Sequence, residues 1–151
     1  MADPGLLPAP PVPQGDYVPV RLHGGFAFVA GMTPRENGEL VVTGRVGADL
    51  DARAAQLAAA IATRRALSAL AAAAGGLDRV TAALHLTVYV AAVDGFTEHS
   101  TVADGASQAL AEALGDRGRV ARAAIGVATL PGGAPVEVSL LAAVEPASGD
   151  G

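Results

Sequence analysis

The segment from Leu50 to Ala74 constrains the fold more than any other part of the chain, because Ala, Leu, Gln and Arg dominate it. These residues are among the strongest helix formers, and the glycine pair Gly75-Gly76 that follows suits a helix C-terminus. Asp49 and Asp51 precede the segment, and either carboxylate can cap the free backbone amides of a first helical turn. The sequence therefore predicts one long helix over residues 50–74.

Extended runs on both sides of this helix predict a β-sheet. Between Leu84 and Val90, apolar residues alternate with His, Thr and Tyr, which is the period of a strand with two different faces. The other expected elements are a hairpin at Tyr17 to Ala30 around Gly24-Gly25, strands at Leu40 to Thr43, Arg122 to Thr129 and Pro135 to Val144, and a second helix at Val102 to Leu114. The last two strands flank a Leu-Pro-Gly-Gly turn and are expected to pair as a hairpin. This order predicts an α+β fold with a single sheet and two helices packed on one face.

The chain is expected to form one folded domain between two short extensions. Five prolines within residues 3–15 exclude a helix or an internal strand, so residues 1–15 should form an extended arm. The domain is expected over residues 16–146, followed by a flexible tail at residues 147–151. Because 51% of the residues are hydrophobic but only 3% are aromatic, the core has to be built from Ala, Val and Leu.

Composition excludes several kinds of chemistry. The chain has no cysteine, so it holds no disulfide, catalytic thiolate or Cys-ligated metal. All ten basic residues are Arg, which excludes Schiff-base and phosphate-loop lysines. The net charge of −5 disfavours nucleic-acid binding, and three isolated His residues at no metal-ligand spacing predict no metal site.

Nothing in the sequence predicts a membrane partner. Arg64 and Arg65 interrupt the most apolar stretch, so a spanning helix is not expected. The N-terminus has no basic region ahead of an apolar one, unlike a secretory signal. We therefore expect a soluble, cytoplasmic protein.

Arg122 and Glu137 are the strand residues best suited to chemistry. Each has the opposite strand parity to the bulkier apolar residues around it, and neither charge should lack a partner. In the expected hairpin Glu137 faces about Ala128, roughly 20 Å along the strand from Arg122, so only a contact between subunits could join them. This register predicts a cyclic oligomer with interfacial sites. The alternative, an ordinary ion pair between the two residues in a sheet or interface, stays open.

Several motifs resemble those of one known family in content, order and spacing. The most specific is the run ARAAIGVATLP at residues 121–131, followed by PVEV at residues 135–138. The upstream matches are DYVP at residues 16–19, FVAG at 28–31, GRVG at 44–47, FT at 96–97 and GAS at 105–107. Over about residues 16–144 the chain thus resembles the RidA/YjgF family, closest to a branch whose activity is less well defined.

The resemblance implies a chorismate-mutase-like α+β fold and a homotrimer with three clefts between neighbouring subunits. Deaminase members of the family hydrolyse small enamine or imine acids, such as 2-aminoacrylate, to 2-keto acids and ammonia without metal or organic cofactor. Carried over, Arg122 would hold the substrate carboxylate through two parallel hydrogen bonds, and Glu137 would orient or deprotonate the attacking water. Tyr17 would line the cleft and steer protons. The implied partners are a small carboxylate-bearing metabolite and further copies of the chain.

The chain also departs from the deaminase pattern among the implied substrate-binding residues. Ala30-Gly31-Met32 stands where deaminase members usually carry Ser-Gly-Gln, and Ala124 stands where a Cys or polar residue is usual. Asp104 takes the place of an Asn, and a carboxylate there would repel an acid substrate. We therefore expect a larger or less polar ligand, with Met32 as an adaptable apolar wall.

Two further functions fit the same residues. One is a noncatalytic module that binds a metabolite or a partner protein in the same cleft. The other is a mutase or a biosynthetic tailoring enzyme on the same scaffold, which could also use an anchoring Arg and a Glu. The sequence does not separate these from hydrolysis.

Overall fold

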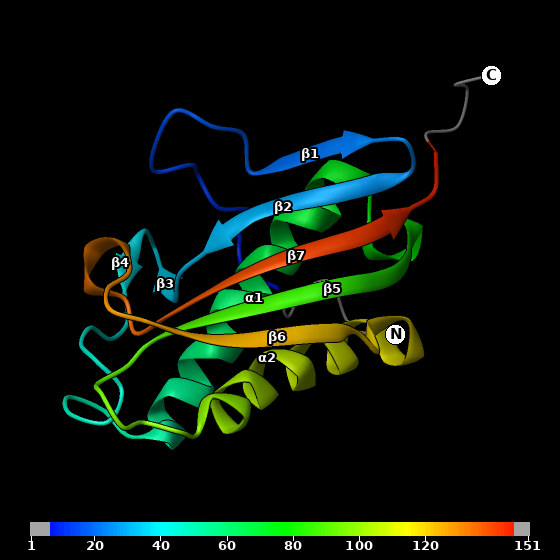
Figure 1. The fold of residues 1–151 in the computed structure, drawn as a ribbon. Coiled ribbons are helices and arrows are strands. Elements are labelled where there is room, and N and C mark those ends of the chain that lie inside the picture. The colour runs from blue at the N-terminus through cyan, green and yellow to red at the C-terminus, as the bar shows by residue number, and fades with distance from the viewer. Residues whose placement is uncertain (1–6, 147–151) are drawn as a thin grey trace.

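The protein is a two-layer α+β structure, seen here in a computed structural model that describes residues 7–146. Helices α1 (Ala52–Ala74) and α2 (His99–Leu114) lie on one face of a five-stranded sheet with the strand order β1-β2-β7-β5-β6 (Figure 1). The strands are β1 (Val20–His23), β2 (Phe26–Met32), β5 (Val80–Ala91), β6 (Ala121–Val127) and β7 (Val136–Val144). This confirms the expected fold class. The expected tail and the first six residues of the expected arm lie outside the described residues.

The last two strands do not form the expected hairpin, because β5 lies between them. Leu86 of β5 is opposite Arg122 in the parallel strand β6 and opposite Leu140 in the antiparallel strand β7. Parallel strands need a crossover connection, and α2 supplies it between β5 and β6. The segment with the short 3-10 turn η4 (Pro131–Gly133) therefore crosses the end of β5 instead of closing a hairpin.

The prediction of a strand at Leu40 to Thr43 is also wrong, except for Leu40. The structure has a two-residue ladder of β3 (Arg35–Glu36) with β4 (Glu39–Leu40). Asn37 and Gly38 have φ angles of 53° and 81°, left-handed values that close a tight turn. The hairpin of β1 with β2, by contrast, is confirmed.

The long helix α1 begins and ends close to the expected positions. Asp51 is its N-cap, with Oδ1 accepting a hydrogen bond from the Ala54 backbone N–H at 2.8 Å. Asp49 instead accepts one from the Arg45 backbone N–H. Gly75 ends the helix with a left-handed φ of 91°, a conformation that favours glycine. The short 3-10 turn η2 (Leu77–Arg79) then leads into β5.

Helix α1 is apolar because it packs in the core. By length and composition alone it is the one described helix that could cross a membrane, but half of its most apolar window is buried inside the domain. Its buried face meets α2 and the sheet, where the largest fully buried side chains include Leu67, Leu70, Leu86 and Leu110. Core packing is thus sufficient to explain its composition.

Small residues allow α1 and α2 to approach closely. A Cβ atom added at Gly105 of α2 would lie 2.0 Å from the backbone oxygen of Gln56 in α1. No side chain fits in that space, so this crossing requires glycine. After α2, the short 3-10 turn η3 (Gly115–Gly118) leads towards β6.

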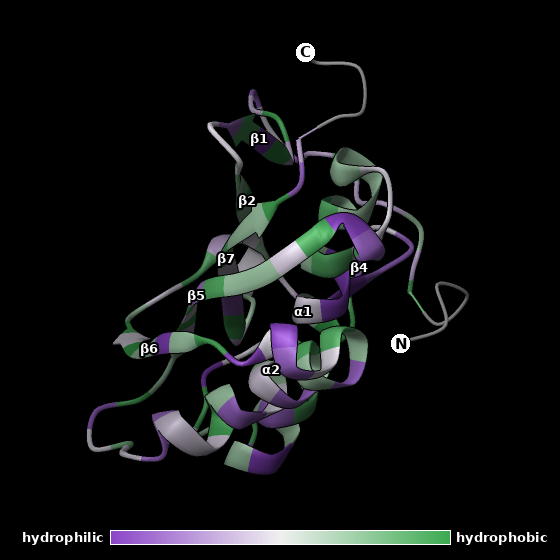
Figure 2. Cartoon of the chain, turned by 90° about the vertical axis from the view of Figure 1, so that its right-hand side faces the viewer, coloured by the Kyte–Doolittle hydropathy of each residue, from purple (hydrophilic) through white to green (hydrophobic). Residues whose placement is uncertain are grey.

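No described helix or strand packs on the other face of the sheet (Figure 2). Phe26, Phe28 and Ile125, which have the strand parity opposite to the buried residues, expose 44%, 51% and 42% of their surface. Large apolar side chains at such exposures are of the kind that an interaction surface buries.

Candidate active site

A small cavity of about 90 Å³ at the end of β2 brings together four of the expected site residues. These are Tyr17, Gly31, Met32 and Glu137, and they come from the loop before β1, from β2 and from β7. β1 pairs with β2 only as far as Val29, so this end of β2 has no neighbour on that side within the sheet. The cavity opens where that pairing stops.

Glu137 is the acid of this cavity. Its neighbours Val136 and Val138 are fully buried, so strand alternation directs Glu137 away from the helices. Its carboxylate packs directly on Gly31, where an added Cβ would lie 2.8 Å from both Cδ and Oε2. Burial raises the pKa of the Glu137 carboxyl. Among residues 7–146 no Arg side chain forms an ion pair with it. Glu137 is therefore a half-buried acid suited to taking up and returning a proton.

Tyr17 and Met32 complete the lining in different ways. The backbone N–H of Gln14 donates to the Tyr17 hydroxyl at 3.2 Å, which leaves the hydroxyl proton available to a second partner. Met32 is 95% buried and gives the cavity an apolar floor. Ala30 does not line the cavity, because its half-buried side chain packs against the core.

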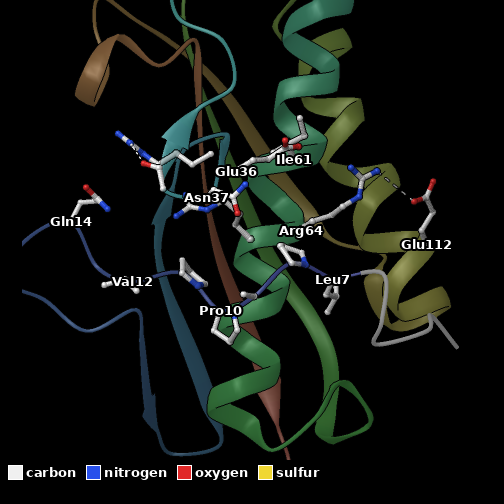
Figure 3. A pocket seen from close by; sticks show the side chains of 15 residues that line it. Leu7, Pro10, Val12, Gln14, Glu36, Asn37, Ile61, Arg64 and Glu112 are labelled. Atoms are coloured by element: carbon white, nitrogen blue, oxygen red, sulfur yellow. Dashed lines mark hydrogen bonds and ion pairs between the residues drawn. The ribbon is translucent and has the colours of Figure 1, made fainter.

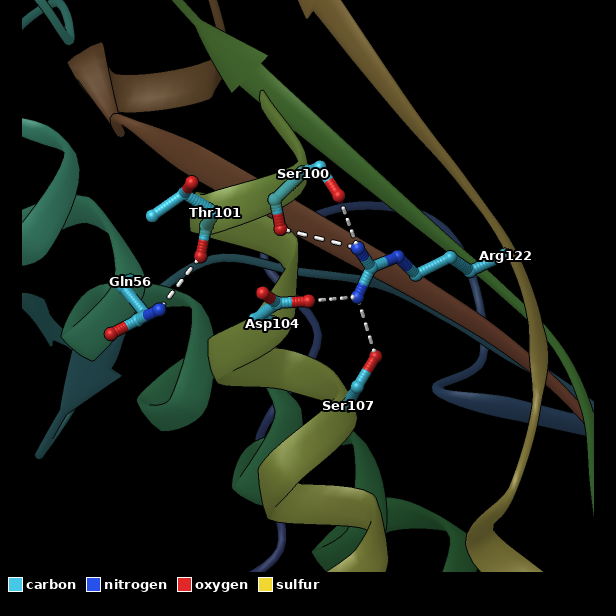
Figure 4. A network of polar contacts seen from close by, with 6 residues as sticks. All are labelled: Gln56, Ser100, Thr101, Asp104, Ser107 and Arg122. Carbon is cyan, nitrogen blue, oxygen red and sulfur yellow. Dashed lines mark hydrogen bonds and ion pairs between the residues drawn. The ribbon is translucent and has the colours of Figure 1, made fainter. Parts of the chain in front are cut away.

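Arg122 lies elsewhere, in a polar network between β6 and α2 (Figure 4). One terminal nitrogen donates to Asp104 Oδ1 at 2.8 Å and to Ser107 Oγ at 2.9 Å. The other donates to the Ser100 carbonyl at 3.1 Å and to Ser100 Oγ at 2.7 Å. All four N–H groups of the two terminal nitrogens therefore have acceptors within the chain. Ala124 has the same parity as Arg122 and packs, half-buried, against the core.

Within one chain the structure does not bring Arg122 and Glu137 together. Arg122 is directed towards α2, Glu137 has the parity of the uncovered face, and β5 separates their strands. The partner of Arg122 inside the protomer is Asp104, so an ion pair with Glu137 in one sheet is excluded. The hairpin that placed the two residues far apart along one strand is wrong, but the two residues are still separated, because their side chains lie on opposite faces of the sheet.

Two arginines that the sequence reasoning did not select also line the cavity, Arg65 of α1 and Arg35 of β3. Burial first, and then the neighbouring Arg35 guanidinium, lower the pKa of Arg65, while Tyr17 acts in the opposite direction. In the sequence Arg65 only interrupts an apolar run. Arg65 is four residues from Ile61, which places both on one helix face, and this spacing was the sequence signal that could have indicated a shared site.

No metal centre is formed by the part of the chain that the structure describes. No three His, Asp or Glu side chains gather there as metal ligands would. His99 instead packs edge-on against Phe96, with ring centroids 5.2 Å apart.

Comparison with known proteins identifies relatives over most of the chain. Residues 3–144 match the family described as "YjgF/chorismate mutase-like, putative endoribonuclease". Protein TCP17 of Trypanosoma cruzi is 40% identical over 136 residues, covering 89% of this chain and 85% of its own length. The crystal structure of Atu1372 from Agrobacterium tumefaciens, a protein described as of unknown function, is 39% identical with a TM-score of 0.84, covering 86% of this chain and 82% of its own. A "putative endoribonuclease" from Shewanella oneidensis is 29% identical with a TM-score of 0.88, covering 91% of each chain.

Proposed function

This chain belongs to the RidA/YjgF family, and on that premise we propose that it hydrolyses small enamine or imine carboxylic acids to keto acids and ammonia, in clefts between the subunits of a homotrimer. The observation that carries the proposal is the cavity in which Tyr17, Gly31 and Glu137 meet. Glu137, the one acid among the described residues that line it, is half-buried and has a raised pKa, which is the property required of a group that exchanges protons near neutral pH. We place the activity in the cytoplasm and assign it no metal or organic cofactor.

The reaction needs one water and one group that moves its protons. The Glu137 carboxylate accepts a proton as the water oxygen bonds to the imine carbon. The protonated Glu137 then donates this proton to the nitrogen, which gives a carbinolamine. In a second exchange Glu137 takes the proton of the carbinol hydroxyl, whose oxygen becomes the keto oxygen, and passes it to the nitrogen, so the carbon–nitrogen bond breaks and ammonia leaves. An enamine substrate first becomes the imine by moving a proton from its nitrogen to its β-carbon. Tyr17 can donate its free hydroxyl proton to the developing charge, because its oxygen already accepts the Gln14 N–H.

The trimer is supported by the uncovered sheet face. Phe26, Phe28 and Ile125 are exposed there, and burying apolar surface of this kind drives subunit association. A neighbouring copy could then bring its β6 edge, with Arg122, towards Glu137. An apolar substrate part would lie against Met32, which agrees with the expectation of a larger or less polar acid.

A noncatalytic binding module is the second candidate, and one specific observation favours it. The guanidinium expected to hold the substrate carboxylate already has four acceptors, in Ser100, Asp104 and Ser107. A carboxylate can displace them only by breaking a charge-assisted hydrogen bond to Asp104. An endoribonuclease role, which the family description names, has less support, because a net charge of −5 offers little attraction to phosphates.

Turnover of freshly generated 2-aminoacrylate and of bulkier imino acids tests the proposal. We expect ammonia release by the wild type, preference for the bulkier acids, and a loss of about 100-fold or more in kcat for Glu137→Gln. Arg122→Ala should raise KM, with the exposed Arg53→Ala as the charge-matched control. Binding of these acids without turnover would favour the module. Full activity of Arg122→Ala would exclude Arg122 as the anchor.

Sedimentation of the purified protein tests the assembly separately. A trimer should form, and Phe28→Asp should dissociate it, because a carboxylate would be buried without a partner. A monomeric wild-type protein would contradict the interfacial cleft whatever the activity.

A further inference from the structure

A large groove of about 1000 Å³ lies between the proline-rich arm and α1 (Figure 3). It shares lining residues with the Glu137 cavity. Two hydrogen bonds hold the described part of the arm: the Ser68 hydroxyl donates to the Pro8 carbonyl, and the Gln14 N–H donates to the Tyr17 hydroxyl. Arg35 and Arg65 line both the groove and the cavity, so the two spaces meet at these guanidinium groups. Each of these residues is within the described part of the chain.

Among the described residues, the two arginines at this junction have no acidic partner. Arg65 donates to the Thr33 carbonyl at 2.7 Å, and Arg35 donates to Thr33 Oγ1 at 3.2 Å and to the Gly38 carbonyl at 2.8 Å. All these acceptors are uncharged. Within residues 7–146, neither guanidinium has a carboxylate within 4.0 Å, although Glu36 also lines the groove.

Among residues 7–146 only Arg64 and Arg122 form ion pairs, and what sets Arg35 and Arg65 apart from the other unpaired arginines is that they line one cavity together. Arg122 has Asp104 at 2.8 Å, and Arg64, next to Arg65 in the sequence, has Glu112 at 4.0 Å. Two half-buried like charges side by side disfavour each other, and the lowered pKa of Arg65 reflects both its burial and Arg35. An anion placed between them would relieve both effects.

The groove also has an apolar wall, while Gln14, Glu36, Asn37, Arg64 and Glu112 form its polar part. Leu7, Pro10 and Val12 of the arm face Ile61 of α1 across it (Figure 3). A ligand that contacts both the two arginines and this apolar wall therefore needs an anionic head and an apolar body several carbons long.

We propose that this groove binds an organic acid with an aliphatic chain, its carboxylate held by Arg35 and Arg65 and its chain lying between the arm and Ile61. Planar guanidinium groups pair with carboxylates through two hydrogen bonds, and the apolar wall supplies area for the chain. The site is distinct from Arg122, and binding there does not require turnover at Glu137.

Octanoate is a suitable probe, with octanamide as its uncharged isostere and acetate as the head without the chain. By titration calorimetry, we expect octanoate to bind the full chain about tenfold or more tightly than octanamide, and acetate to bind far more weakly. Arg65→Gln and Arg35→Gln should each weaken octanoate by about tenfold while leaving octanamide unchanged. Arg53→Gln removes an exposed charge from the same helix and should have no effect.

Isoleucine methyl NMR locates the ligand directly, because the chain has two isoleucines in well-separated places. Ile61 lines the groove, whereas Ile125 lies on the uncovered sheet face. Octanoate should shift the Ile61 methyl signals and leave those of Ile125 in place.

Equal affinity for octanoate and octanamide would overturn the proposal, as would shifts confined to Ile125. An Arg65→Gln variant that binds like Arg53→Gln would also overturn it. The comparison of the two probes on the wild type needs no variant, so it holds even if a substitution unfolds the chain. Failure of imino-acid turnover would refute the proposed function without moving any of these readouts.

Discussion

Gly31→Ala should damage both stability and activity through a single contact, the one with Glu137. An alanine Cβ would lie 2.8 Å from Glu137 Cδ and Oε2, about 0.6 Å short of ordinary van der Waals contact at 3.4 Å. Gly31 does not have a positive φ, so alanine adds no backbone strain. The whole cost therefore comes from displacing a carboxylate that packs between β2 and the cavity.

The expected magnitude follows from two opposing contributions. Overpacking by one methyl group costs about 1–3 kcal/mol, and replacing glycine with alanine recovers about 0.4–1 kcal/mol by restricting the unfolded chain. We expect Gly31→Ala to lower the free energy of unfolding by about 1–2 kcal/mol in urea. In the Glu137→Ala background the contact is gone, so the same change should be neutral or slightly stabilising.

The double-mutant cycle therefore decides the matter without knowledge of the substrate. Where turnover is measurable, moving the acid by about half an ångström should also lower kcat by about tenfold or more. An equal cost of Gly31→Ala in both backgrounds would show that Glu137 does not pack against this glycine, and the description of the cavity would then be wrong.

Four other changes test separate parts of the structure. The pKa of Glu137 is raised in the folded state, so between the ordinary value of 4.5 and that raised pKa the folded protein holds more protons than the unfolded chain. The free energy of unfolding of the wild type should therefore fall as pH rises through this window. The Glu137→Gln variant should lack that fall. Gly105→Ala should destabilise by about 2 kcal/mol or more, since its Cβ would meet the Gln56 backbone oxygen; the exposed Ala111→Gly, costing about 1 kcal/mol by helix propensity, is the control. Asp51→Ala should cost about 1 kcal/mol in urea denaturation through loss of the α1 N-cap. Asp104→Asn removes the carboxylate that pairs with Arg122. The KM for an imino acid should therefore fall if Arg122 binds the substrate carboxylate. An unchanged KM would mean that Arg122 only connects β6 with α2.

The sequence predicted elements well where a local signal was enough. The Ala-rich run and Gly75-Gly76 place α1, and alternation around Val136 and Val138 correctly puts Glu137 on the other face. The Leu-Pro-Gly-Gly segment misled, because a turn signal does not reveal whether a third strand lies between the strands that it joins. That β5 lies between β6 and β7 depends on α2 as a crossover, which is a property of the whole chain.

The site was predicted in part for the same reason. Motif matching selected Tyr17, Gly31 and Glu137, and the structure places them around one cavity. The motifs do not include Arg65, and its four-residue spacing from Ile61 is a weak signal, because an arginine in an Ala-rich helix is usually solvated. Its half-buried position depends on the Thr33 carbonyl, 32 residues away in sequence, and on an arm whose course no local pattern predicts.

The arginines of the two proposed sites differ in whether a carboxylate neutralises them. The arginine that the motif marks is paired with Asp104, whereas Arg35 and Arg65, which it does not mark, have only uncharged acceptors among the described residues. Arg65 lines both the groove and the Glu137 cavity. An acid whose carboxylate is held by Arg65 can extend either beneath the arm or towards Glu137, and a short acid cannot reach both. Octanoate should therefore inhibit turnover of a small imino acid competitively if the junction is shared, and should leave it unchanged if the reacting acid is held by Arg122 of a neighbouring subunit.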